Sequence, residues 1–84
     1  MERQAFYEAV TALLLDLRPD MECPRADTHL WANGYLDSFA MVQVLAQLEE
    51  LIGSEIELGA DALPTFFTME RMYDTYVAGN GHRN

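Results

Sequence analysis

The sequence has few basic residues, a single cysteine and no long apolar run. Among its 84 residues, five Lys plus Arg stand against fourteen Asp plus Glu, which gives a formal net charge of −9 at pH 7. This excess of negative charge repels phosphate backbones, so the sequence predicts no nucleic-acid partner. The expected partners are proteins with basic surfaces. Cys23 has no second cysteine for an internal disulfide, and we interpret it as an incidental loop thiol in a reducing compartment.

The chain also lacks the patterns of membrane and secreted proteins. No stretch approaches the roughly 18 apolar residues of a membrane span, and residues 1–10 lack the basic-then-apolar pattern of a signal peptide. We therefore expect a cytoplasmic protein without a membrane span. The length allows one small domain with a modest core, predicted over residues 1–79, followed by a flexible tail over residues 80–84. We do not expect an elaborate enzyme with a cleft between two lobes. We expect the protein to be a monomer.

Apolar spacing and cap residues predict an all-α fold, a three- to four-helix bundle with a long loop between its first two helices. One apolar face predicts a first helix over residues 3–17, made by Phe6, Val10, Leu13, Leu14 and Leu17. Proline, glycine and Asp/Asn residues make residues 18–37 a long connection, which we expect to be held to the core by Leu30, Trp31 and Leu36. The second helix is predicted from Ser38 to Ile52, ending at Gly53.

The remainder of the chain is expected to cross back and form a last helix. Ile56 and Leu58 are predicted to anchor an extended crossing, and Asp61 to cap a single turn that ends at Pro64. A last helix capped by Thr68 is predicted to share one face among Met69, Met72, Tyr73, Tyr76 and Val77. No histidine or carboxylate cluster accompanies the acidic side chains of the crossing, so no metal site is expected.

The second helix divides into two faces. One face is predicted to pack in the core, and it contains Met41, Val44, Leu45, Leu48, Leu51 and Ile52. The opposite side, which we call the helix-two strip, contains Phe39, Ala40, Val42, Gln43, Ala46, Gln47 and Glu50. Residues 38–48 contain no charge although the protein is strongly acidic, so we interpret the strip as a docking surface. The alternative, in which Phe39 closes the core and the glutamines are merely solvated, remains open.

Asp37 and Ser38 stand at the predicted start of this helix. Asp37 is well placed as the N-cap, which leaves Ser38 at the first helical position with its hydroxyl outward. A hydrolase nucleophile would need a base and an oxyanion hole, but the segment is not G-x-S-x-G, and His29 and His82 lie in a loop and in the tail. An attachment point needs only exposure, and helix amides favour a phosphodiester there. The sequence therefore favours Ser38 as an attachment point and predicts no catalytic residue.

The segment "LWANGYLDSFAMVQVLAQLEE" resembles the phosphopantetheine attachment motif of acyl and peptidyl carrier proteins, through Gly34, Asp37 and Ser38. The resemblance extends to the amphipathic first helix, the long first loop, the "GSEIEL" crossing and the Thr-capped last helix. It implies a free-standing carrier with the carrier-protein fold, which is a substrate of other enzymes and not itself an enzyme.

By this resemblance, Ser38 would receive 4′-phosphopantetheine from coenzyme A through a phosphopantetheinyl transferase that uses Mg²⁺. The thiol of the arm would hold the cargo as a thioester, and Asp37 would support the helix and recognition by the transferase. The helix-two strip would meet an adenylating or acyl-transferring loading enzyme, followed by condensing, modifying or transfer enzymes.

Within the family, "GYLDSF" followed by "VQVLAQLEE" is most similar to D-alanyl carrier proteins and discrete carriers of bacterial natural-product pathways. Ala40, Gln43 and Gln47 stand where fatty-acid carriers usually have charges. The resemblance implies an amino acid or small acyl cargo in nonribosomal peptide or polyketide biosynthesis. Two alternatives are a D-alanyl carrier for teichoic acid D-alanylation and a non-catalytic helical interaction module.

Overall fold

The computed structural model describes residues 1–56 and 62–78, which are mostly helical and contain no strand. The elements are α1 (Arg3–Leu17), α2 (Ser38–Ile52), the 3₁₀ helix η1 (Leu63–Phe67), α3 (Met69–Met72) and the π-helix η2 (Tyr73–Ala78). The first two helices have the predicted bounds. The all-α prediction is therefore confirmed for the described residues.

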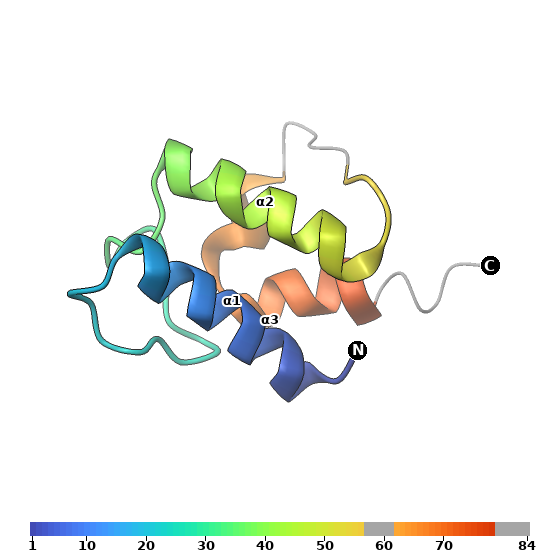
Figure 1. Cartoon of the computed structure of the whole chain (residues 1–84), viewed down its shortest axis with the longest axis horizontal. Helices are drawn as coiled ribbons and strands as arrows, with labels where there is room; N and C mark the ends of the chain where they lie inside the picture. The colour runs from blue at the N-terminus through green and yellow to red at the C-terminus, as the bar shows by residue number, and fades with distance from the viewer. Residues whose placement is uncertain (57–61, 79–84) are drawn as a thin grey trace.

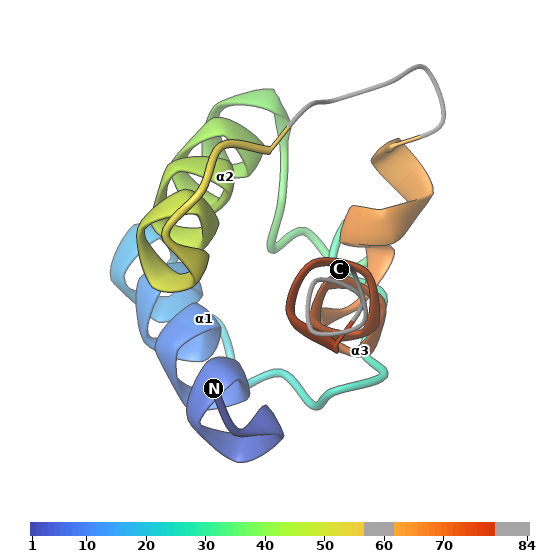
Figure 2. The ribbon, with the colours of Figure 1, turned by 90° about the vertical axis from the view of Figure 1, so that its right-hand side faces the viewer.

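The helices are arranged around one core. α1 and α2 lie side by side and run in opposite directions, so that the end of α1 and the start of α2 lie at the same end of the molecule (Figure 1). The α3 segment lies across from both of them (Figure 2). Residues 18–37 connect α1 to α2. None of the helices in the described ranges is both long enough and apolar enough to span a membrane.

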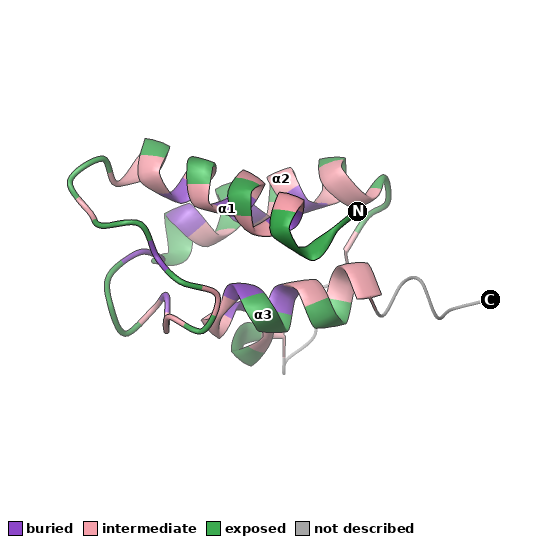
Figure 3. Ribbon diagram, turned by 90° about the horizontal axis from the view of Figure 1, so that it is seen from below, coloured by how far each residue is buried: buried purple, intermediate pink, exposed green. Residues whose placement is uncertain are grey.

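The core is made by buried residues of α1, α2, η1, α3 and the connection between α1 and α2 (Figure 3). Each of the two long helices contributes three buried residues at i, i+4 and i+8, which are Phe6, Val10 and Leu14 from α1 and Ala40, Val44 and Leu48 from α2. The other buried apolar residues are Leu30, Tyr35, Leu36, Phe66, Met69 and Met72. Full burial of one large apolar side chain contributes about 1.5–3 kcal/mol, so these contacts favour this arrangement of the helices.

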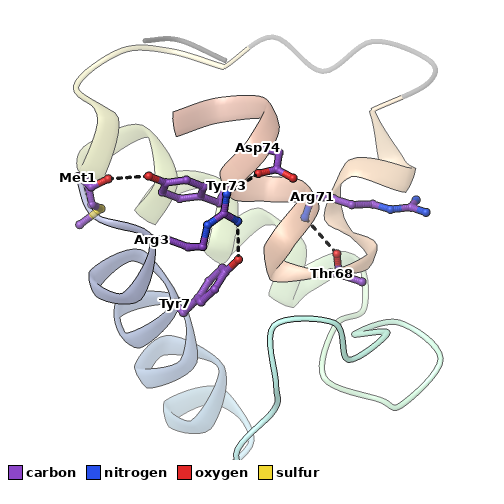
Figure 4. Close-up of polar contacts among 7 residues, drawn as sticks. All are labelled: Met1, Arg3, Tyr7, Thr68, Arg71, Tyr73 and Asp74. Carbon is purple, nitrogen blue, oxygen red and sulfur yellow. Dashed lines mark hydrogen bonds and ion pairs between the residues drawn. The ribbon is translucent and has the colours of Figure 1, made fainter. Parts of the chain in front are cut away.

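The predicted ends of α2 and the start of α3 are confirmed by their local geometry. The Asp37 carboxylate accepts a hydrogen bond from the Ala40 N–H at 2.8 Å at the start of α2. At the other end, Gly53 has a φ of 75°, the left-handed conformation that glycine adopts most readily. Thr68 caps α3, since its Oγ1 accepts from the Arg71 N–H at 3.1 Å (Figure 4).

The last helical segment buries the predicted face. Met69 and Met72 of α3 are buried, and Tyr73, Tyr76 and Val77 of η2 pack against the core. Partial burial raises the pKa of Tyr76. This face is therefore confirmed as a packing face.

One turn differs from its prediction. Pro64 does not end a turn but lies in the first turn of η1, which continues to Phe67. A proline fits there because the first N–H groups of a helix have no partner within the helix. The predicted roles of Leu58, of the Asp61 cap and of the tail over residues 80–84 lie outside the described residues.

Candidate functional site

The chain is led into α2 by a turn and two buried side chains. Gly34 has a φ of 85°, a conformation that other residues rarely adopt. The N–H groups of Tyr35 and Leu36 then both donate to the Leu30 carbonyl, at 2.8 and 3.2 Å. Tyr35 and Leu36 are buried, as is Leu30. These contacts fix the position at which α2 begins, directly after Asp37.

Ser38 is the first residue of α2 and is exposed. Within the described part of the chain, its hydroxyl makes no hydrogen bond. The helix cap is supplied by its neighbour, because Asp37 has an extended backbone and its side chain accepts from Ala40. Ser38 is therefore not needed as the cap, and its hydroxyl is open to solvent.

Asp37 is held on both of its carboxylate oxygens. Oδ1 accepts from the Ala40 N–H, while Oδ2 accepts from Arg18 Nη2 at 2.6 Å. The hydrogen bond from Ala40 is the main cause that lowers the pKa of Asp37, and the charge of Arg18 lowers it further. Both interactions favour the ionised carboxylate, so Asp37 is a charged cap.

Arg18 is a site residue that the sequence analysis did not identify. Its backbone N–H donates to the Leu14 carbonyl at 2.8 Å and so ends α1, while its side chain reaches Asp37 at the start of α2. The ion pair therefore joins the adjoining ends of the two helices (Figure 1). Nineteen residues separate the partners, a distance over which no local sequence pattern predicts a contact.

The helix-two strip is exposed except at one important position. Phe39 and Val42 are large apolar residues that are 64% and 60% exposed. The other members are exposed or partly exposed, and they are Gln43, Ala46, Gln47 and Glu50. Ala40 is fully buried, so its assignment to the strip is wrong. Ala40 lies one and two turns before Val44 and Leu48, on the line of α2 that faces the core.

His29 is engaged within the connection between α1 and α2. Its Nδ1 accepts from the Ala32 N–H at 3.1 Å, and its ring lies 4.5 Å from the ring of Phe67 between centroids. One ring nitrogen is thus occupied by a backbone donor. His82, the other histidine, lies outside the described residues.

Two open grooves border the same connection. One, of about 670 Å³, is lined mainly by polar residues between Asp20 and Tyr35, and the other, of about 550 Å³, lies between α1 and residues 23–26. The exposed Cys23 lines both grooves, whereas Ser38 lines neither. Ser38 is exposed and lies outside both of these grooves.

The residues around Ser38 fit a covalently attached phosphodiester. The hydroxyl of Ser38 is exposed, and the preceding residue, Asp37, is paired with the guanidinium of Arg18. Comparisons of the chain with models of protein families, with curated proteins and with solved structures give no match.

Proposed function

We propose that the protein is an acyl or aminoacyl carrier that bears 4′-phosphopantetheine on Ser38 and presents a thioester-bound amino acid or small acyl unit to other enzymes. The observation that carries the proposal is the exposure of Ser38 at the start of α2, beside exposed Phe39 and Val42. The motif resemblance supports it. The proposal includes the finer fold, in which α1, α2 and α3 form a bundle of the carrier-protein type and residues 18–37 are its long first loop.

The residues of the chain have limited chemical tasks in this function. Ser38 provides the hydroxyl oxygen that bonds to phosphorus, and its exposure lets a phosphopantetheinyl transferase approach. Asp37 keeps the start of α2 formed, so that Ser38 stays at a fixed position. The attached group supplies a thiol that holds the cargo as a thioester. Recognition and chemistry of the cargo belong to the partner enzymes.

The helix-two strip, now without Ala40, is the proposed docking surface for these partners. Phe39 and Val42, which are neighbours on one face of the first turns of α2, offer apolar contact area, and Gln43 and Ala46 continue the exposed surface without charge. Partners that meet this strip recognise it by shape and apolar contact more than by charge pairs. This property favours loading enzymes of amino-acid or specialised acyl pathways over partners that require an acidic helix.

An interaction module is the second candidate function. The exposure of Phe39 and Val42 fits a helix that binds one fixed protein partner without any modification. In that case Ser38 would only begin the helix. The two candidates differ in whether Ser38 accepts a covalent group.

Intact-protein mass spectrometry tests the proposal. The folded protein is incubated with coenzyme A, Mg²⁺ and a broad-specificity phosphopantetheinyl transferase, and we expect the mass to rise by one phosphopantetheine. Ser38→Ala should show no rise, whereas Ser54→Ala, at an exposed serine beyond α2, should be modified like the wild type. The proposal fails if the wild type gains no mass, or if Ser38→Ala gains the same mass. An unmodified protein that keeps its partner after Ser38→Ala would support the interaction module.

A further inference from the structure

We propose that Arg18 is a positioning residue for the group on Ser38, because its guanidinium both holds Asp37 as the cap of α2 and balances the negative charge that a phosphodiester on Ser38 adds. The inference deepens the proposed carrier function and rests on it. Arg18 acts from the end of α1, so that a residue outside the attachment motif shapes the attachment site.

The geometry leaves Asp37 no free carboxylate oxygen. One oxygen accepts from the Ala40 N–H at 2.8 Å, and the other accepts from Arg18 Nη2 at 2.6 Å. A charge-assisted hydrogen bond is shorter and stronger than a bond between neutral groups. Arg18 therefore fixes the orientation of the carboxylate that caps the helix.

The side chain of Arg18 has hydrogen-bonding capacity left for a second anion. A guanidinium has five N–H donors. In Arg18, Nη2 donates to Asp37 and Nη1 donates to the Leu17 carbonyl at a long 3.5 Å. The side chain is 31% exposed, so its free donors reach solvent. Arginine is well suited to hold a carboxylate and a phosphate together, because its donors spread in one plane.

The charge balance at this helix end makes such a cation valuable. Asp37 and Ser38 are consecutive, with Cα atoms about 3.8 Å apart, so a phosphodiester on Ser38 lies close to the carboxylate. Two like charges on neighbouring residues repel each other, and the protein already has a formal charge of −9. A positive charge beside both anions offsets that repulsion.

The other arginines in the described part of the chain are placed elsewhere. Arg3 pairs with Asp74, and Arg71 bonds the Pro64 carbonyl and lies over the ring of Phe67. Arg25 is exposed in the connection, and its side chain makes no hydrogen bond or ion pair within the described residues. Arg25 is therefore the matched control for Arg18: it lies in the same connection, and its substitution causes the same change in net charge.

A comparison of unmodified and phosphopantetheinylated protein tests the inference. Urea unfolding is measured in both forms for the wild type, Arg18→Gln, Arg18→Lys and Arg25→Gln. We expect Arg18→Gln to raise the unfolding equilibrium constant about threefold in the unmodified protein and about tenfold in the modified protein. Arg18→Lys should recover only part of the loss, because it restores the charge but not the planar set of donors. Arg25→Gln should have the same small effect in both forms.

Phosphorus NMR of the folded, modified protein provides a readout that a purely structural role would not change. The phosphodiester resonance should move in Arg18→Gln and stay at the wild-type position in Arg25→Gln. Equal effects of Arg18→Gln in both forms, with an unmoved resonance, would overturn this inference while the carrier function stands. A wild type that accepts no group overturns the carrier function and this inference together.

Discussion

Two arginine–aspartate ion pairs within residues 1–56 and 62–78 have the same chemistry but differ in what surrounds them. Arg18 and Asp37 join the end of α1 to the start of α2, with side chains 31% and 57% exposed. Arg3 and Asp74 join the start of α1 to η2, with side chains 49% and 62% exposed. Exposed ion pairs contribute little by themselves, so the second task of each partner decides its importance.

In the second pair it is the arginine that has further contacts. Arg3 donates to the Tyr7 hydroxyl at 2.8 Å, and its guanidinium lies 4.4 Å from the ring centroid of Tyr73 (Figure 4). The hydroxyl of Tyr73 in turn donates to the Met1 carbonyl at 2.9 Å. The bond with Tyr7, followed by that with Asp74, raises the pKa of Arg3. The network therefore ties the start of α1 to the last helical segment.

The two pairs contrast in which partner has additional contacts. In the first pair it is Asp37, which also caps a helix. In the second pair it is Arg3, which also donates to the Tyr7 hydroxyl and lies over the ring of Tyr73. Removing the aspartate should therefore matter most in the first pair, and removing the arginine should matter most in the second.

The largest effect is expected from Asp37→Ala. The substitution removes the cap of α2 and leaves Arg18 without its partner, so we expect Tm to fall by about 5 °C. Asp74→Ala, which breaks the other ion pair but no cap, should lower Tm by about 1 °C. Thermal unfolding followed by circular dichroism measures both. Equal losses in the two variants would contradict the contrast.

An intermediate effect is expected from Arg3→Ala. The loss of the tyrosine contacts and of the ion pair should lower Tm by about 3 °C. Arg3→Lys keeps the charge but not the planar guanidinium, so it should recover only part of this loss. Arg25→Ala serves as the control, with little change expected. If Arg3→Lys restored the full Tm, charge alone would explain the role of Arg3.

Local signals explain why the helices could be predicted from the sequence. The apolar spacing of α1, the cap Asp37 and the terminal Gly53 each act within a few residues, and each of them was confirmed. The two ion pairs could not be predicted, since their partners lie 19 and 71 residues apart and meet only after the helices have packed. The hydrogen bond from the Tyr35 hydroxyl to the Glu22 carbonyl inside the connection was not predicted, for the same reason.

The candidate site was predicted less completely than the helices. The cap at Asp37 and the exposure of Ser38 follow from the local sequence, as does the exposure of Phe39. Ala40 was misplaced because alanine is common both in cores and on surfaces, so its burial depends on which helices approach it. Arg18 was missed because it reaches Asp37 only when residues 18–37 bring the end of α1 beside the start of α2, and the sequence does not specify the path of that connection.

The smallest effect is expected from Asp37→Asn, and it depends on pH. Asparagine is also a good N-cap, so this variant keeps an acceptor for the Ala40 N–H and loses the charge that pairs with Arg18. The folded protein lowers the pKa of Asp37, so the ionised carboxylate stabilises the fold at pH values above the ordinary pKa of an unfolded aspartate. This stabilisation is lost as the pH falls through the lowered pKa of Asp37. The stability advantage of wild type over Asp37→Asn, measured by urea unfolding, should therefore be constant near neutral pH and vanish in acid.

Added salt should reduce this stability advantage at neutral pH, because the pair of Arg18 and Asp37 is exposed. Asp74→Asn is the matched control under the same conditions. An advantage that persisted unchanged into strong acid would show that the charge of Asp37 does not stabilise the cap, and the contrast between the two pairs would then depend on the hydrogen bond alone.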